Sequence, residues 1–400
     1  MMNARIVIGK NFGDEGKGLA VDYFSQLAAV KQQPCLVVRH NGGAQAGHSV
    51  DLPDRRFVFH QLSSGSFRGA DTFWADTFLP DLYKLSEEMQ AFSTLSSQKP
   101  RILSFGGCRC VIIDDVLLNM AIETSRGERR HGSCGMGINE SVVRSQHEAY
   151  RLSLAALKAL RADALYRTLQ RIRREYLPLR LSELGLSLKD SSEFIGLLQN
   201  DNVLYNAAEA MCRNAEQVEL IGKEDLLPYR EVIFEGAQGL LLDENYLDFA
   251  PYLTTSRTGL RQPLGLCRNL FPHAAAQAVY VTRTYVTRHG RGPLPHEGGF
   301  DLRRYPVHDR TNLPNEWQES LRFAPHGSPQ AFLTPLLEDS KGSDVSRSVM
   351  LTHLNETDRK IITAGGALTV DEWASAFRIR RYFDRIYLSD SPYSCDIREM

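Results

Sequence analysis

Two glycine-rich segments near the N-terminus carry residue types that suit phosphate chemistry. The first, NFGDEGKGLAVD (residues 11–22), follows the apolar run RIVIG and places Asp14 and Lys17 among three glycines. A strand, a flexible loop and the start of a helix form a natural anion site, and Lys17 adds a positive charge. Because bare phosphate would repel Asp14, this residue indicates either a ligand for nucleotide-bound Mg²⁺ or a base toward an acceptor. The alternative is a plain Gly-Asp turn that binds nothing.

The first segment is not a Walker A loop. That motif, G-x-x-x-x-G-K-[ST], requires a glycine where Asn11 stands and a hydroxyl residue where Gly18 stands. A P-loop GTPase-type switch is therefore disfavoured.

The second segment, NGGAQAGHSV (residues 41–50), follows another apolar run, CLVVRH. Its glycines allow a ligand to approach the backbone closely, and His48 lies at the edge of a strand. Such a histidine suits acid or electrostatic work on a phosphate, whereas the alternative is a structural histidine. Together the two segments predict phosphoryl transfer, in which His48 stabilises the bridging oxygen and Asp14 handles the acceptor proton.

Apolar, β-rich runs alternate with helical or glycine-rich stretches along the chain. The helical spacing of Leu19–Val30 after the first glycine segment predicts a strand–loop–helix unit. Residues 146–186 are dense in Leu, Ala and Arg at helical spacing, and they predict a helical subdomain at about 146–228. We therefore expect one α/β domain over residues 1–400, with a largely parallel central sheet and surrounding helices. The predicted strands are Arg5–Gly9, Cys35–His40, Arg56–Leu62, Arg101–Phe105, Arg230–Gly236 and Ala278–Arg288.

Composition excludes several classes of protein. The net charge of -1 gives no general attraction for nucleic acid or an anionic membrane. We find neither an apolar stretch of about 18 residues nor the apolar region of a signal peptide. The 7 cysteines are scattered, which argues against a disulfide framework. We expect a cytoplasmic protein.

The two glycine segments resemble the GDEGKGK and GG-x-NAGHT signatures of the adenylosuccinate synthetase family. Further similar blocks follow in the family's order as far as Glu297. They are FVFHQLSSG (57–65), GSCGMGINESVVR (132–144), FEGAQGLLLD (234–243), APYLTTS (250–256) and TYVTRHGRGPLPHE (284–297).

This resemblance implies a reaction and a set of roles. The family phosphorylates the 6-oxo group of IMP with GTP, and the amine of aspartate then displaces the phosphate. Asp14 matches the base that removes the N1 proton, and it also matches a Mg²⁺ ligand. His48 matches the acid, and the carbonyl of Gly47 matches a further Mg²⁺ ligand. The resemblance implies contacts with the phosphate donor from Gly13, Lys17, Gly47 and Ser49.

Other matches concern the acceptor nucleotide. Gln238 and Thr254 match positions that contact its base and phosphate, and Gln45 replaces an asparagine of the family. Arg144 lies near the arginine that crosses the family's dimer interface, so we expect a homodimer. In the loop that binds the acceptor's phosphate, two threonines of the family are replaced by Ser133 and Cys134.

The segment that binds the donor base departs from the family pattern. The family reads guanine through LTKLD, whereas this chain has LTHLNE, with His353 and Asn355 at the two reading positions. An amide presents one acceptor and one NH₂ group, which suits adenine better than guanine. LSDSPYS, which includes Ser389, resembles the family's STGPDR only weakly. The departures predict ATP instead of GTP, or relaxed selectivity.

The arginine-rich loop that binds aspartate in the family is missing. The chain has TNLPNEWQESLRFAPHG (311–327) there, and of its residues Arg322 alone aligns with one of the arginines. The loss could alter the amine or the sugar that is accepted. The alternative is unchanged substrates, with Arg303, Arg304 or Arg310 compensating.

These departures resemble a phage branch of the family that uses ATP, dGMP and L-aspartate, and whose product leads to 2-aminoadenine in DNA. The leading hypothesis is therefore a Mg²⁺-dependent ligase with these substrates. The alternatives are the standard GTP and IMP reaction and a non-catalytic purine-nucleotide sensor on the same fold.

Overall fold

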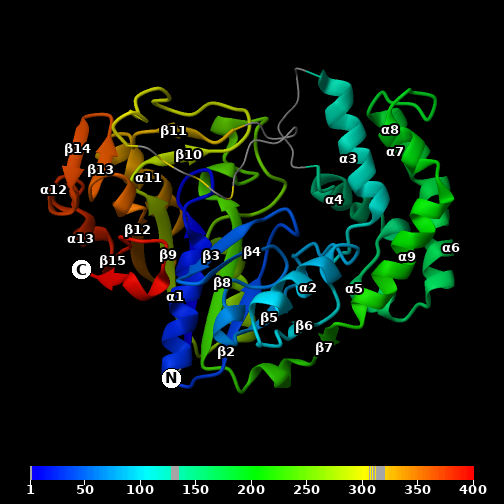
Figure 1. Cartoon of the computed structure of the whole chain (residues 1–400), viewed down its shortest axis with the longest axis horizontal. Coiled ribbons are helices and arrows are strands. Elements are labelled where there is room, and N and C mark those ends of the chain that lie inside the picture. Colours follow the sequence, from blue (N-terminus) through cyan, green and yellow to red (C-terminus); the bar gives the residue numbers. More distant parts are fainter. Residues whose placement is uncertain (1, 128–134, 306, 308, 310, 312–319) are drawn as a thin grey trace.

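A ten-stranded sheet, in the order β16-β15-β12-β9-β1-β8-β2-β5-β6-β7, forms the centre of the computed structural model (Figure 1). The model describes residues 2–127, 135–305, 307, 309, 311 and 320–400. Neighbouring strands are parallel, except that β16 runs antiparallel to β15. The strands are β1 (Asn3–Gly9), β2 (Cys35–Arg39), β5 (Asp71–Trp74), β6 (Ile102–Ser104), β7 (Val218–Leu220), β8 (Glu231–Gly239), β9 (Ala275–Arg283), β12 (Ser346–Thr352), β15 (Arg385–Leu388) and β16 (Arg398–Glu399).

Three hairpins and a set of helices surround this sheet. The hairpins are β3 (His48–Leu52) with β4 (Arg55–Phe59), β10 (Val286–Arg288) with β11 (Arg322–Ala324), and β13 (Lys360–Thr363) with β14 (Gly366–Thr369). The helices are α1 (Lys17–Val30), α2 (Leu85–Leu95), α3 (Ile113–Arg126), α4 (Ile138–Gln146), α5 (Leu154–Lys158), α6 (Ala162–Glu175), α7 (Leu177–Glu183), α8 (Glu193–Leu198), α9 (Asp201–Ala215), α10 (Arg261–Leu270), α11 (Pro329–Asp339), α12 (Val370–Ala376) and α13 (Ile379–Tyr382).

The central strands are apolar on both faces because helices cover both. On β1, Ile6 and Ile8 join a core with residues of α10, α11 and α12, whereas Val7 packs with the buried face of α1. Alternation along a strand sends consecutive side chains to opposite faces, so a continuous apolar run suits this position. The α/β fold with a largely parallel sheet is as predicted.

The helical region is larger than the predicted 146–228. Helix α3 packs on α7 and α8 through one apolar cluster, and α4 packs on α3, so the region begins near residue 113. In Figure 1 these helices lie beyond the β7 end of the sheet. Several arginines of the region pair with buried acids, as in Arg173–Asp114 and Arg180–Glu140. These pairs support a structural role for those arginines.

One predicted strand of the sheet lies elsewhere. The run Arg56–Leu62 contributes to β4, which pairs antiparallel with β3 in a hairpin outside the main sheet. Its rings Phe57 and Phe59 pack edge-on against Phe67 and Phe92. The apolar pattern therefore reflects an aromatic cluster and not burial within the parallel sheet.

In the part of the chain that the structure describes, no helix combines the length and apolar character needed to cross a membrane.

His326, at the start of the turn before α11, is a buried titratable group next to the sheet. Its Nε2 lies 2.9 Å from the carbonyl of Arg283, and the side chain is 1% exposed. Burial, followed by the nearby positive charge of Lys10, lowers the pKa of His326 to about 3. The imidazole is therefore neutral at pH 7, and its Nε2–H donates to that carbonyl.

His326→Gln should weaken the dependence of stability on pH. The folded-state pKa lies below the unfolded value, so the stability present at pH 7 falls as the pH decreases through 6.5 toward the folded value. At pH 5 the wild-type histidine should cost about 2 kcal/mol relative to pH 7, whereas glutamine keeps an N–H donor and does not titrate. Urea unfolding of both proteins at pH 7 and pH 5 measures the difference. Equal pH dependence of the two proteins would contradict the neutral, buried state of His326.

Candidate active site

The carboxyl ends of β1, β2, β8, β9 and β12 carry the predicted catalytic and binding segments. Since these strands are parallel neighbours, their carboxyl ends lie along one edge of the sheet, where α/β proteins bind ligands. The glycine loop, defined here as residues 10–16, follows β1 and leads into α1. Its last residue, Gly16, adopts φ 94° at the N-terminus of the helix, a conformation that favours glycine.

Side chains from three strands hold the glycine loop by donating hydrogen bonds to three consecutive backbone carbonyls. The carbonyl of Gly13 accepts from Oγ1 of Thr287 at 3.2 Å, that of Asp14 from Nε of Arg283 at 2.6 Å, and that of Glu15 from Oγ1 of Thr352 at 2.9 Å. These donors come from β9, β10 and β12. Among the described residues, no group accepts a hydrogen bond from the backbone N–H groups of residues 14–18. These amides therefore stay available for an anion at the N-terminus of α1.

Gly18 brings the two glycine-rich segments together. A Cβ at this position would lie 2.7 Å from the carbonyl oxygen of Ser49 and 3.2 Å from Cβ of His48. The first turn of α1 thus packs directly on the start of β3. The close packing that glycine permits places His48 beside the helix N-terminus.

His48 and Glu235 form a buried pair. Nδ1 of His48 lies 2.6 Å from Oε1 of Glu235, whose side chain is fully buried on β8. The same carboxylate accepts from the Oγ and the N–H of Ser64, and Arg39 lies 3.8 Å away. Burial would raise the pKa of Glu235, but His48 and Arg39 together with the hydrogen bonds lower it to about 2. The carboxylate is therefore charged and orients the imidazole, with Nδ1–H as the donor.

The nearby negative charges do not offset the burial of Lys17 and His48. Burial lowers the pKa of His48 to about 4 despite Glu235, and burial also lowers the pKa of Lys17 despite Glu15 and Asp14. A bound polyanion would oppose both shifts, because a nearby negative charge favours the protonated forms. The arrangement suits phosphate binding.

The predicted acceptor residues lie around the same edge. Gln238, at the end of β8, has φ 65°, and its backbone lies 3.6 Å from a Cβ position on Gly13. Oε1 of Gln45 is buried without a hydrogen-bond partner among the described residues, as expected of an amide that receives a ligand. The amide of Thr254 donates to Leu242 at 2.9 Å, which fixes its loop over the end of β8. Of these three residues, Gln238 lies directly beside the glycine loop, at Gly13.

The predicted donor-base residues also form one unit. The turn η7 (Leu354–Glu356) follows β12, and the N–H of Leu354 donates to the carbonyl of Ser389 at 3.2 Å. Asn355 is exposed there, and His353 precedes the turn with φ 60°. Thr352 of the same segment contacts the glycine loop through its hydrogen bond to Glu15. The glycine loop and the segment predicted to bind the donor base are therefore adjacent.

Comparison of the sequence with protein families identifies the family of this chain. The model of the adenylosuccinate synthetase family matches residues 6–318. This chain belongs to that family. The adenylosuccinate synthetase of Clostridium novyi is 28% identical over 309 residues, which cover 74% of this chain and 66% of that protein. One from Clostridium botulinum is 29% identical over 307 residues with the same coverage. This chain therefore matches slightly under two thirds of the length of these relatives.

Two solved structures share the fold. The fully ligated adenylosuccinate synthetase of Plasmodium falciparum has a TM-score of 0.71 at 16% identity, over 99% of each chain. The succinoaminodeoxyadenylate synthetase of cyanophage S-2L, solved with dGMP and with dATP as energy donor, has a TM-score of 0.64 at 16% identity. That match covers 100% of this chain and 95% of the phage protein. At this identity both show the adenylosuccinate synthetase fold alone.

The donor set fits Mg²⁺ bound together with a nucleotide. Side chains alone would not hold a metal, because the described residues contain no group of three or more His, Cys, Asp or Glu side chains suited to one. The carboxylate of Asp14, half-exposed and without a hydrogen bond to any described residue, and the carbonyl of Gly47 are oxygen ligands of the kind that Mg²⁺ takes beside phosphates and water. When bound, Mg²⁺ would neutralise charge on the phosphates.

Three residues predicted to bind a substrate or the phosphate donor instead contact other groups of the protein. Arg144 is buried and binds Asp115 at 2.8 and 2.9 Å and the carbonyls of Cys110 and Tyr150, so its predicted contact across a dimer is not available in this conformation. Arg322 binds the carbonyls of Gly290 and Gly292 and the carboxylate of Glu297. The hydroxyl of Ser49 contacts Thr311 and Arg56, on the opposite side of β3 from His48.

Other predictions have different outcomes. The hydroxyl of Ser389 donates to the carbonyl of Ser391 at 2.7 Å and so shapes its turn. Nδ1 of His353 lies 2.8 Å from Oγ1 of Thr352, and burial lowers the pKa of His353 well below its usual value. Ser133, Cys134 and Arg310 lie outside the described residues.

Four residues of the site were not predicted from the sequence. Glu235 was detectable, since a carboxylate inside the apolar strand VIFEG requires buried partners. Arg283, Thr287 and Thr352 carry no comparable signal. They become relevant only because β9, β10 and β12 lie beside the glycine loop.

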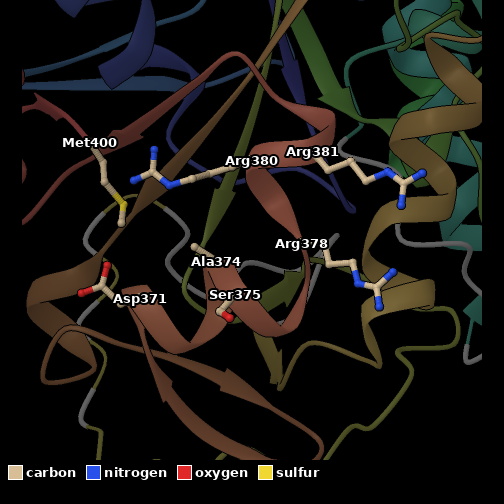
Figure 2. A pocket seen from close by; sticks show the side chains of 7 residues that line it. All are labelled: Asp371, Ala374, Ser375, Arg378, Arg380, Arg381 and Met400. Atoms are coloured by element: carbon tan, nitrogen blue, oxygen red, sulfur yellow. The ribbon is translucent and has the colours of Figure 1, made fainter.

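A pocket of about 440 Å³ lies apart from these residues, on α12, α13 and the C-terminal residue (Figure 2). In Figure 2 the side chains of Arg378 and Arg381 extend to one side of the pocket, and Arg380 extends toward Met400. No residue of the candidate site lines it, so its position does not mark the chemistry. The lining residues are Asp371, Ala374, Ser375, Arg378, Arg380, Arg381 and Met400.

Binding of ATP at pH 7 should be coupled to proton uptake by His48. The free imidazole has a pKa of about 4, and a triphosphate beside it should raise that pKa. Isothermal titration calorimetry in two buffers of different ionisation enthalpy measures the protons taken up. His48→Asn should reduce the uptake, because the amide does not titrate. Equal uptake by both proteins would contradict a phosphate contact at His48.

Proposed function

We propose that this chain is a Mg²⁺-dependent carbon–nitrogen ligase that joins L-aspartate to dGMP, with ATP as phosphate donor. In the first step the γ-phosphoryl group of ATP passes to the 6-oxygen of the guanine base, the N1 proton goes to Asp14, and ADP leaves. In the second step the amine of aspartate attacks C6, the bond from C6 to the phosphorylated oxygen breaks, and inorganic phosphate leaves. The product is a succino-2-amino-deoxyadenylate.

The observation that carries the ligase proposal is the placement of Asp14, Lys17 and His48 around one helix N-terminus. A lactam oxygen becomes a competent nucleophile when N1 loses its proton, which gives Asp14 its role as base. His48, held by Glu235, would stabilise charge on the oxygen between the transferring and leaving phosphates. Lys17 and the amides of residues 14–18 would hold the phosphates.

Asn355 supports ATP as the donor. It lies on the exposed turn beside Ser389, at the position where the family has a carboxylate. A carboxylate accepts both the N1–H and the 2-amino group of guanine, whereas an amide offers one acceptor and one donor, as adenine requires.

The region around residues 303–322 supports a changed substrate site. Arg322 is occupied by two backbone carbonyls and Glu297, so a carboxylate clamp for aspartate would need other arginines. Arg303 and Arg304 are exposed in that region and are the described candidates. The cyanophage enzyme, which was solved with dGMP, shows that this fold can bind the proposed acceptor.

The second candidate is the standard reaction of GTP, IMP and L-aspartate. It is favoured by sequence similarity, since the clostridial adenylosuccinate synthetases are 28% and 29% identical to this chain over 74% of its length. A homodimer and a cytoplasmic location stay predictions.

Phosphate release by the purified protein tests the proposal. The assay crosses ATP and GTP against dGMP, GMP and IMP, with Mg²⁺ and with or without L-aspartate. Release that requires ATP, dGMP and aspartate is the expected result. Release that requires GTP, IMP and aspartate would replace the proposal by the standard reaction, and no release in any combination would favour the nucleotide sensor.

Asp14→Asn should abolish turnover and leave donor binding measurable. The amide keeps the shape of the side chain and removes the base, so kcat should fall by a factor of roughly 10² or more. Calorimetric titration with ATP and Mg²⁺ is the control for binding. Unchanged turnover would rule out Asp14 as the base.

Asn355→Asp should shift donor preference toward GTP. The new carboxylate can accept both guanine N–H groups and would face the N1 lone pair of adenine. The ratio of kcat/KM for GTP to that for ATP should rise by roughly 10- to 100-fold. Asn245 is exposed in the loop after β8, so Asn245→Asp is the matched charge control. It should leave the ratio of kcat/KM for GTP to that for ATP unchanged. An unchanged ratio in Asn355→Asp would exclude this residue from base recognition.

A further inference from the structure

We propose that Arg283 is a positioning residue that holds Asp14 in its working orientation and ties it to the segment that binds the donor base. This inference rests on the proposed role of Asp14 as base. It concerns a side chain at the end of β9 that would touch neither substrate.

The guanidinium of Arg283 has a protein partner for each of its nitrogens. Nε donates to the carbonyl of Asp14 at 2.6 Å, Nη1 to the hydroxyl of Tyr285 at 2.9 Å, and Nη2 to the carboxylate of Asp309 at 2.9 Å. The side chain of Arg283 is 6% exposed. A planar group with three fixed contacts has little rotational freedom, so the contact with Asp14 is well defined.

The carbonyl contact matters because of the backbone conformation of Asp14. Its φ is 57°, in the left-handed region that residues other than glycine rarely adopt. A hydrogen bond from a charged donor is stronger than a neutral one and fixes the peptide plane between Asp14 and Glu15. Fixing this plane restrains the backbone from which the Asp14 side chain projects, and it turns the N–H of Glu15 away from Arg283.

Tyr285 extends the contact to the donor-base turn. Its hydroxyl accepts from Arg283 and donates to the carboxylate of Glu356, which belongs to the same turn η7 as Asn355. The neighbouring Thr284 also donates to the carbonyl of His353 at 3.3 Å. Asn355 is thus connected through Glu356, Tyr285 and Arg283 to the backbone of Asp14. A base bound on this turn would therefore bias the position of the catalytic carboxylate.

Hydrogen exchange of the protein without nucleotide tests the positioning role first. Arg283→Gln removes the charged donor, so the hydrogen-bonded loop amides of Lys10 and Asn11, which donate to Val281 and Glu15, should exchange at least tenfold faster, with those of β2 unchanged. Arg5→Gln is the matched control, because Arg5 is a mostly buried arginine near the opposite end of β1 that pairs with Glu231. It should not accelerate exchange in the glycine loop more than in β2. Equal acceleration of the loop by both variants, or none by Arg283→Gln, would overturn the proposal.

Kinetics with the substrate pair found active test the consequence for catalysis. Arg283→Gln should lower kcat by about 10- to 100-fold and change KM for the acceptor less than about threefold, since the base is displaced while binding contacts remain. Arg283→Lys, which keeps a charged donor, should recover part of kcat. A change in KM alone, or no recovery by lysine, would overturn the role.

A double-mutant cycle tests the connection to the donor base. Tyr285→Phe removes the hydroxyl that joins Arg283 to Glu356, and Asn355→Ala removes the base contact. Independent effects would make the fold-loss of kcat in the double variant equal to the product of the two single fold-losses. If the connection operates, the fold-loss in the double variant should be at least threefold smaller than that product. Multiplicative losses would overturn the coupling. If no substrate pair is turned over, the proposed function fails, and the exchange experiment still decides whether Arg283 positions the loop.

Discussion

The buried carboxylate of Glu235 is the interaction around which the candidate site is arranged. It lies on a central strand, β8, and an uncompensated charge there would be costly. Its compensation comes from His48 on β3, Ser64 after β4, and Arg39 at the end of β2. One charge therefore fixes how the second glycine-rich segment and the β3–β4 hairpin sit over the sheet. The orientation of the His48 imidazole follows from the same constraint.

The groups around this carboxylate leave the site prepared for an anion. Burial lowers the pKa values of Lys17 and His48, and Nε and Nη2 of Arg39 have no partner among the described residues. Burial raises the pKa of Glu15, so the acid nearest to Lys17 compensates its charge incompletely. A triphosphate would supply the missing negative charge. We therefore expect phosphate binding and protonation of the site to be linked through electrostatics.

The residues that match the family pattern and those that depart from it lie on different parts of the fold. The residues proposed for phosphoryl transfer follow the central strands β1, β2 and β8, whose neighbours cover them on both sides. Asn355 and Ser389 follow β12 and β15, nearer the edge of the sheet, and Arg303 and Arg304 lie in the long connection between β10 and β11. Exposed loops tolerate change because few packed contacts depend on them. A family member can therefore change its donor or amine while the machinery around Asp14 and His48 stays intact.

The sequence by itself determined the class of fold and the two phosphate segments. Apolar strands buried on both faces and glycine-rich turns between strand and helix are local patterns, so they predict a parallel sheet, α1 and the positions of Asp14, Lys17 and His48. Some sequence expectations differ from the structure. The run that contains Phe57 and Phe59 has the pattern of a strand in the main sheet but packs in an aromatic cluster. Arg144, predicted to bind a ligand, forms a buried ion pair with Asp115. Only the tertiary structure decided that Arg283, Thr287 and Thr352 hold the carbonyls of the glycine loop. Those contacts join residues about 270 to 340 positions apart, and no local pattern records which distant side chain a peptide carbonyl will meet.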